Sequence, residues 1–308
     1  MEFESYLAEL KDESAELTAS GLTHLDGLTP EQASALREAW LSVEADRRRL
    51  VVRQLAELAE DNVELNFDAA LIVALDDPDA SARRGAIKGL WEYEARDLIP
   101  PLLRLLEKDE EPEVRAEAAL ALGRYVLLSE FEKLGERHAR RVEAGLRRAL
   151  EDELEEDEVR ARALESIAAA QREWVAGAIE QAYESETPRM RVSAVHAMGR
   201  SCEARWLPLL LEELTSEEPE MRYEAATALG SLGDRRTAGA LAPLLQDEDG
   251  EVREAAIAAL GQIGGGEAKE LLRSLAGDPS PGIREAVAAA LTEADFAEDP
   301  LSVGYEVQ

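Results

Sequence analysis

One arginine returns at a nearly fixed interval along most of this 308-residue chain. It lies in a pattern that reads apolar, Arg, two variable residues, Ala, two variable residues, small, Leu, Gly. The pattern is clearest as VRAEAALALG at 114–123, MRYEAATALG at 221–230 and VREAAIAALG at 252–261. The aligned copies place the repeated arginine at Arg53, Arg83, Arg115, Arg160, Arg191, Arg222, Arg253 and Arg284. The intervals are 30, 32 and 45 residues and then 31 four times, which predicts one repeated structural unit.

Each copy predicts an amphipathic helix, because small or apolar residues stand one before the arginine and three, six and seven after it. A second amphipathic run precedes each copy, such as LIPPLLRLLEKD at 98–109, and acid-rich turns such as DDPD at 76–79 separate the two. We call the upstream helix A and the arginine-bearing helix B. The repeat glycines are interpreted as C-caps of helix B, at Gly123, Gly199, Gly230 and Gly261. The unit is therefore a predicted helical hairpin that buries its apolar surfaces against neighbouring hairpins.

These hairpins resemble HEAT repeats, in particular the short bacterial form found in HEAT-like proteins of the phycobilisome-lyase type. The resemblance covers residues 30 to about 292 and implies an all-α fold, a right-handed α-solenoid of about eight HEAT-like hairpins. Ankyrin repeats have a similar period, but their T-P-L-H signature is absent.

The resemblance also implies a ladder along the stack, formed by the arginines and by an aspartate six residues before each of them. Four repeats have that aspartate, as Asp77, Asp109, Asp247 and Asp278. The other four have Arg47, Leu154, Ser185 and Ser216 at the same position. We therefore expect a ladder of Arg83, Arg115, Arg160, Arg191, Arg222, Arg253 and Arg284 that is broken in the middle and at the N-terminus.

Departures from the repeat define the predicted boundaries. Residues 1–28 lack the motif and are interpreted as an N-terminal helical cap, and the array then runs over 29–292, starting with Thr29 as N-cap and Pro30 at the first helical position. The interval of 45 residues indicates an insertion at about 126–139, either a tolerated surface insertion or a binding loop. Residues 293–308 form a C-terminal tail that drapes over the last repeat, is disordered or is bound by a partner.

Charge and composition limit the partners. With 66 acidic and 34 basic side chains the formal charge is −32, which opposes binding to nucleic acid or to an anionic membrane and permits a basic protein client. A single cysteine, Cys202, excludes an internal disulfide, and with three histidines it gives too few ligands for an ordinary zinc cage. The acidic N-terminus lacks a signal peptide, so we predict a cytoplasmic protein without a metal or cofactor.

No catalytic constellation is found in the sequence. His24, His138 and His196 lie in different units, and Cys202 has no evident activating base. A basic stretch over 137–148 precedes the acidic run EDELEEDE, and self-neutralisation is preferred to a phosphate site there. A second basic cluster, over 45–53, faces neighbouring acidic turns or serves in docking.

The candidate partner-binding residues come from the B helices, which typically line the concave face in solenoids of this kind. Positions one, two and five after the arginine point away from the stacking seam, at Arg84, Lys88, Glu117, Arg162, Glu165, Tyr223, Glu224 and Thr227. Trp91, Glu92 and Tyr93 add an aromatic-acid-aromatic cluster at a helix end that could anchor a partner.

The predicted function is a non-catalytic interaction scaffold that binds a protein or peptide client, with the oligomeric state left open. Because some similar proteins are bilin lyases or their helpers, a lyase-like activity on a tetrapyrrole-carrying protein is the alternative. Other HEAT-like proteins are DNA glycosylases, but those depend on a basic concave track and the charge of −32 conflicts with one.

Overall fold

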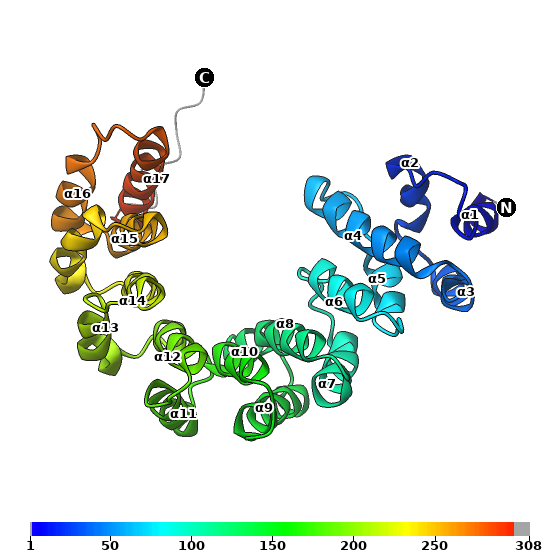
Figure 1. Cartoon of the computed structure of the whole chain (residues 1–308), viewed down its shortest axis with the longest axis horizontal. Coiled ribbons are helices and arrows are strands. Elements are labelled where there is room, and N and C mark those ends of the chain that lie inside the picture. Colours follow the sequence, from blue (N-terminus) through cyan, green and yellow to red (C-terminus); the bar gives the residue numbers. More distant parts are fainter. Residues whose placement is uncertain (1, 299–308) are drawn as a thin grey trace. The chain divides into compact units, whose positions relative to one another are not determined.

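The computed structural model describes residues 2–298, which form helices and turns with no strand among them (Figure 1). The all-α prediction is therefore confirmed. The first elements are α1 (Glu2–Leu10), α2 (Ala19–Leu22), η1 (Thr23–Leu25), α3 (Pro30–Trp40), α4 (Ala45–Asp61), α5 (Asp68–Ala74), α6 (Ala80–Gly89), η2 (Arg96–Leu98), α7 (Ile99–Lys108), α8 (Pro112–Glu130), α9 (Glu136–Glu151) and α10 (Asp157–Ile167). The remaining elements are α11 (Glu173–Tyr183), α12 (Pro188–Arg200), η3 (Ala204–Trp206), α13 (Leu207–Glu213), α14 (Pro219–Leu232), η4 (Arg235–Gln246), α15 (Gly250–Ile263), α16 (Gly265–Ser274) and α17 (Pro281–Glu298).

The chain divides into two compact units, with the boundary between α10 and α11. Unit 1 ends at Ile167 and contains α1, α2 and the helix pairs α3/α4, α5/α6, α7/α8 and α9/α10. Unit 2 begins at Ala168 and contains the pairs α11/α12, α13/α14, η4/α15 and α16/α17. Within each unit successive B helices pack on one another, as α4 on α6 and α14 on α15, so the protein is a helical-repeat solenoid as predicted.

Polar side chains in the turns determine where the helices begin. Thr29 accepts a hydrogen bond from the backbone N–H of Gln32 at 3.3 Å, and the Gln32 side chain accepts from Thr29 N at 2.9 Å. This capping box confirms the predicted start of the first A helix. In the acid-rich A–B turns, Asp79 caps α6 by accepting from Ala82 N at 3.1 Å, and Asp249 caps α15.

The C-cap interpretation is wrong for the repeat glycines, which are Gly123, Gly199, Gly230 and Gly261. All of them lie inside B helices, where they let the next B helix approach closely. A Cβ added to Gly199 would lie 2.7 Å from Cα of Ala228, and one added to Gly230 would lie 2.8 Å from Cα of Ala259. The left-handed C-cap of α14 is instead Gly233, with φ of 63°.

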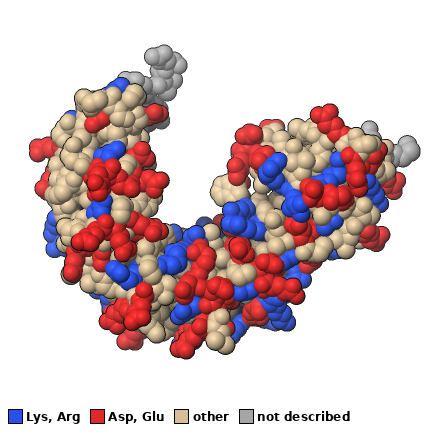
Figure 2. All heavy atoms as spheres, viewed as in Figure 1, with Lys and Arg blue, Asp and Glu red and all other residues tan. Residues whose placement is uncertain are grey.

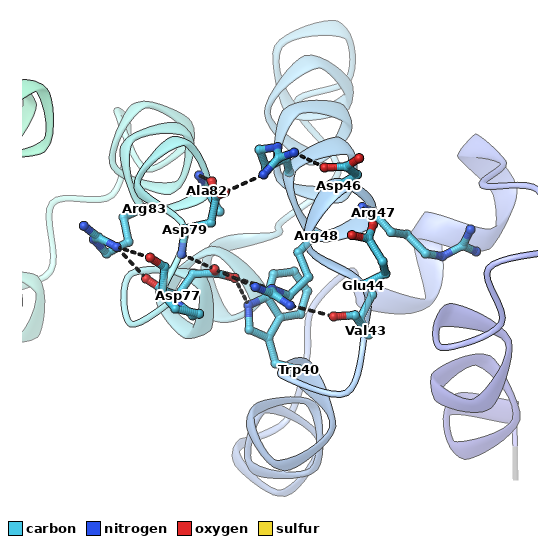
Figure 3. Close-up of polar contacts among 12 residues, drawn as sticks. Trp40, Val43, Glu44, Asp46, Arg47, Arg48, Asp77, Asp79, Ala82 and Arg83 are labelled. Atoms are coloured by element: carbon cyan, nitrogen blue, oxygen red, sulfur yellow. Dashed lines mark hydrogen bonds and ion pairs between the residues drawn. The ribbon is translucent and has the colours of Figure 1, made fainter. Parts of the chain in front are cut away.

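The first arginine of the ladder is Arg48 and not Arg53 (Figure 3). Its Nε donates to Asp77 Oδ2 at 2.7 Å and its Nη2 to Asp77 Oδ1 at 3.1 Å. A third bond runs from Nη1 to the carbonyl of Val43 at 2.6 Å, and Trp40 Nε1 donates to Asp77 at 2.6 Å. Arg53 is instead exposed beside Glu57. The α4–α6 joint is thus built on a buried carboxylate with two cross-helix donors.

Two other ladder steps have the same geometry. Arg83 donates to both oxygens of Asp109, at 2.7 and 2.6 Å, and Arg222 donates to both oxygens of Asp247, at 2.7 and 2.8 Å. Each arginine also bonds a carbonyl of its own turn, as Arg83 does with Asp77 O at 2.8 Å. One guanidinium therefore ties its own A–B turn to the carboxylate of the next repeat.

The ladder does not break at Leu154, because the next residue supplies the carboxylate. Arg115 donates to the two oxygens of Glu155 at 2.9 and 2.7 Å, while Leu154 is 97% exposed. Glu155 lies one residue later than the aspartate of other repeats, and its longer side chain still reaches Arg115. Arg160 has a different environment and donates to Leu150 O at 3.3 Å, with Asp157 of its own helix 3.5 Å away.

The last two ladder arginines bond their own turns. Arg253 Nη1 donates to Asp247 O and Arg284 Nη1 to Asp278 O, each at 2.6 Å. The carboxylate of Asp278 accepts from Ser280 N at 2.8 Å and so stabilises the turn before α17.

The N-terminal segment is fastened to the array by Arg47. Its Nε donates to Leu10 O at 2.8 Å and its Nη1 to Ala15 O at 2.7 Å. The equivalent position in α8 is Val114, which is buried in the core. The first repeat thus has at this position a long arginine side chain that contacts the N-terminal segment. Leu22 and Leu25 of the same segment are buried.

The predicted insertion spans the end of α8, the turn that follows it and the start of α9. α8 has 19 residues and α9 has 16, compared with 10 in α7. At the other end, α17 continues to Glu298, so the predicted tail starts later than residue 293, and its residues 299–308 lie outside the described part of the chain. Among the helices described, none has the length and apolarity needed to cross a membrane.

Candidate interaction surface on the B helices of unit 1

A groove with a volume of about 690 Å³ lies between α4 and α6 of unit 1. Leu50, Val52, Ala56 and Gly85 form its apolar floor. A Cβ on Gly85 would lie 2.9 Å from Val52 Cγ1, so glycine is what lets α6 lie this close to α4. The groove is therefore shaped by the helix contact itself.

A second groove of about 330 Å³ lies between α6 and α8 and shares Glu60 and Lys88 with the first. Two large apolar side chains stand out of its walls, Trp91 at 56% exposure and Leu120 at 45%. We call the two adjoining grooves the B-face surface. It combines an apolar floor with exposed anchors, which is the composition of protein interaction sites.

Charges of both signs line the B-face surface, as over much of the molecule (Figure 2). Glu117, whose side chain is 13% exposed, lies 3.2 Å from Arg84 Nε and 3.6 Å from Lys88 Nζ. Arg53 lies 3.7 Å from Glu57 in the same manner. The basic members of these pairs are 46–68% exposed, so a partner can reach them, although the Glu117 carboxylate itself is largely buried.

The turn that presents Trp91 is held by one arginine of α8. Arg124 Nη1 donates to the carbonyls of Leu90, of Trp91 at 2.8 Å and of Tyr93 at 3.1 Å. Burial lowers the pKa of Arg124, and the neighbouring Tyr125 hydroxyl donates to the Tyr93 carbonyl at 3.3 Å. Trp91 is therefore displayed on a backbone that is fixed from below, which reduces the entropy lost on binding.

The structure brings four of the predicted site residues together on the B-face surface, namely Arg84, Lys88, Trp91 and Glu117. Tyr93 turns toward its own loop, where its hydroxyl donates to Asp97 at 3.0 Å, and burial with that bond raises its pKa to about 12. Glu92 is exposed next to Trp91 and does not line either groove.

The remaining predicted residues lie elsewhere. Arg162 pairs with Glu165 in α10, at 2.9 Å, but Glu165 is 7% exposed, so placing it on the open face was wrong. Its carboxylate is covered by neighbouring helices while it accepts from Arg162. In unit 2, Tyr223 is 38% exposed, whereas Glu224 and Thr227 are half-buried.

Sequence reasoning missed the residues that shape the B-face surface. Leu120 stands at a position that is variable between repeats, and Arg124 follows the repeat glycine, where the pattern assigns no role. Gly85 is a signal that could have been used, because a glycine inside a helix indicates close approach of another element. Among residues 2–298, no group of three or more His, Cys, Asp and Glu is arranged to hold a metal ion.

Comparison with solved structures finds helical-repeat proteins. The complex of CpcE and CpcF of phycocyanin lyase from Nostoc sp. PCC7120 is 21% identical, with a TM-score of 0.51, and the match covers 87% of this chain and 94% of that one. Escherichia coli YibA is 18% identical, with a TM-score of 0.46 and coverage of 82% and 98%. Human deoxyhypusine hydroxylase is 18% identical, with a TM-score of 0.37 and coverage of 96% of both chains.

Sequence comparison identifies the repeat itself. No curated protein matches the chain. The sequence profile of HEAT repeats matches residues 68–155 and 207–292, which together make up more than half of the chain. With the paired helices and the arginine ladder, this match shows that the protein belongs to the HEAT-repeat family.

Proposed function

We propose that the protein is a non-catalytic interaction scaffold that binds a protein or peptide client on the B-face surface of unit 1. The observation that carries this proposal is the pair of adjoining grooves along α4, α6 and α8, with Trp91 and Leu120 exposed in one of them. A tryptophan held on a rigid turn beside an apolar floor is the typical anchor of a binding hot spot.

The chemistry of the grooves describes the client. An apolar side chain of the client packs between Trp91 and Leu120, and its neighbours carry both charges, because Lys88 and Glu60 lie where the grooves meet. The charge of −32 on the whole chain favours the approach of a basic client, while these local pairs select among the clients that arrive.

The non-catalytic part of the proposal is supported by how the charged side chains of the grooves pair with one another. Arg84 and Lys88 both face Glu117, and Arg49 pairs with Asp79 and Asp46. The charged groups thus satisfy one another along the rim and do not converge on one point, as an active site requires.

The test is selection of binders from a random peptide library displayed on phage, with the intact protein as bait. We expect enriched peptides that contain an aromatic or aliphatic anchor and lose at least about tenfold in affinity for Trp91→Ala, a typical hot-spot loss. Phe131→Ala is the matched control, because Phe131 is 69% exposed but lies on the turn after α8.

Hydrogen exchange with the best peptide then maps its site. Protection over α4, α6 and α8 supports the proposal. Protection confined to the A helices α5 and α7, or equal binding to Trp91→Ala and wild type, would falsify it.

The lyase-like alternative has its own arm in the same experiment. A bilin added to the protein gives a coloured complex and an altered absorption spectrum if a tetrapyrrole is bound. Under the scaffold proposal the spectrum of the bilin is the same with and without the protein.

A further inference from the structure

A third groove, of about 380 Å³, lies on the opposite helix layer of unit 1, between α7 and α9. Its floor is apolar and includes Pro100, Leu103 and Ala144. Gly145 packs directly against the Leu103 side chain, so the absence of a side chain there brings α9 down onto α7. The groove is therefore a built feature of the A-helix contact and is separate from the B-face surface.

The walls of this groove are basic although the chain is strongly acidic. Five cationic side chains line it and only one carboxylate does, that of Glu107. The cationic residues are Arg104, Lys108, Arg140, Arg141 and Arg148. In a chain with 66 acidic and 34 basic side chains, such a local excess is the reverse of the average surface.

The cations of the groove are accessible to a ligand. Arg148 pairs with Glu107, and Arg140 pairs with Glu136, but both arginines are more than half exposed, at 61% and 73% of their side chains. Arg104 lies 2.6 Å from the exposed Asp76. Exposed pairs of this kind contribute about 0–1 kcal/mol, so a stronger anion displaces them readily.

We propose that the α7–α9 groove binds a phosphorylated peptide segment of a partner protein. A phosphoserine carries about −1.5 to −2 charges near neutral pH on three acceptor oxygens, and arginine forks bind such oxygens in pairs. Lys108 and Arg141, which lie on α7 and α9, grip the phosphoryl group from the two sides of the groove.

The compact dianion fits this surface better than a run of carboxylates does. A run of acidic residues extends beyond the groove and meets Asp76 and Glu136, exposed carboxylates that pair with arginines of the groove. At physiological salt the Debye length is about 8 Å, so a charge concentrated inside the groove is attracted by the nearest cations, whereas the distant acidic surface is screened.

The apolar floor explains why the ligand is a peptide and not free phosphate. A groove of about 380 Å³ is at the small end of the range for sites that enclose organic ligands. Pro100 and Ala144 are exposed on its floor and contact the residues that flank the phosphoserine. Inorganic phosphate makes only the ionic part of these contacts.

The test uses fluorescence anisotropy with a labelled peptide of alanine, glycine and leucine residues around one phosphoserine. We expect the full-length protein to bind it, with affinity falling as salt rises, and to bind the unphosphorylated peptide roughly tenfold or more weakly. The double variant Lys108→Gln/Arg141→Gln weakens binding of the phosphopeptide roughly tenfold as well.

Lys133→Gln/Arg137→Gln is the matched control, because both side chains are exposed, neither lines the groove and the net charge changes equally. The affinity of this control variant for the phosphopeptide should stay within about twofold of wild type, because only the long-range electrostatic attraction is reduced and salt screens it. Equal loss in the two double variants overturns the proposal. Equal binding of both peptides overturns it too, and inorganic phosphate that competes at the same concentration as the peptide excludes a peptide ligand.

Discussion

The joint between α4 and α6 and the joint between α12 and α14 solve the same packing problem in different ways. In the first, Arg48 and Trp40 both donate to Asp77, a carboxylate with 0% side-chain exposure. In the second, Ser216 stands where other repeats have an aspartate, and Gly199 packs directly on the backbone of Ala228. The first joint combines a buried charge cluster with a glycine that packs on a side chain, Val52, whereas in the second joint the glycine packs directly on a neighbouring backbone.

The difference teaches that the ladder is not the only cohesive element of the repeat. A buried carboxylate must be desolvated, and it repays this cost only when every donor is in place. A glycine–alanine contact has no such requirement, but it tolerates no added volume. Loss of the buried charge should therefore destabilise the first joint, and an added methyl group should destabilise the second.

Loss of charge should have its largest effect in the first joint. Asp77→Ala leaves the Arg48 guanidinium and the Trp40 N–H without their acceptor in the core. We expect a loss of about 3–5 kcal/mol in the free energy of unfolding, measured by urea denaturation. Asp76→Ala is the control, because Asp76 is 51% exposed, and it should cost no more than about 0.5 kcal/mol. Equal losses in the two variants would show that the buried pair adds no stability.

Gain of a methyl group should have its effect in the second joint. The Cβ of Gly199→Ala would lie 2.7 Å from Ala228 Cα, so α12 and α14 must separate. We expect a net loss of about 1–3 kcal/mol, despite the better helix propensity of alanine. Gly177→Ala in α11 meets no atom within 4 Å and should be neutral or stabilising. A stable Gly199→Ala protein would contradict the packing role.

The joint between α14 and α15 has both an arginine–aspartate pair and a glycine that packs on the neighbouring helix. Its stability should depend on pH. The Arg222 guanidinium donates to Asp247 and holds the pKa of that carboxyl below its usual value of 3.8. The folded state therefore favours the ionised form, and this stabilisation is present above the unfolded pKa and is lost as pH falls through the folded pKa. Asp247→Asn should cost about 1–2 kcal/mol at neutral pH.

Urea denaturation at a series of pH values checks the sign. The difference between wild type and Asp247→Asn should be constant from about pH 7 to pH 5 and should shrink below about pH 4, because asparagine does not ionise. A difference that grows on acidification would mean that the pair does not stabilise the folded state.

The repeat pattern predicted the fold because its period reports which residues face a neighbour, and that is local information. It failed where two residues could occupy one register. Arg53 follows the apolar Val52, as the motif requires. The buried residues of α4, however, are Val51, Val52 and Leu55, which lie three, four and seven residues after Arg48. Only the position of Asp77 in space selects between the two arginines.

The candidate surface was predicted in part for the same reason. Arg84, Lys88 and Glu117 follow from their offset to the ladder arginine, since the offset fixes the face of a helix. The depth of a groove depends on the separation of two helices, which Gly85 sets through its contact with Val52. One wall of the basic groove was visible in the sequence as the basic stretch over 137–148, but Lys108 of the other wall is far from it in the sequence and joins it only in the fold.

The smallest expected effect is a gain in stability. It tests whether an arginine–aspartate pair like that of the first joint can be built into the second. Ser216→Asp places a carboxylate at the repeat position of Asp109 and Asp247, which by register pairs with the arginine of the preceding repeat, here Arg191. The turn is already suited to it, since the carbonyl of Ser216 accepts from Arg222 at 2.8 Å as the equivalent carbonyls do in other repeats. We expect a stabilisation of about 0.5–1 kcal/mol, because the new pair is partly exposed. A double-mutant cycle with Arg191→Gln isolates the pair, and a gain of the same size in the Arg191→Gln background would show that aspartate acts on the turn alone and that no ladder step has formed.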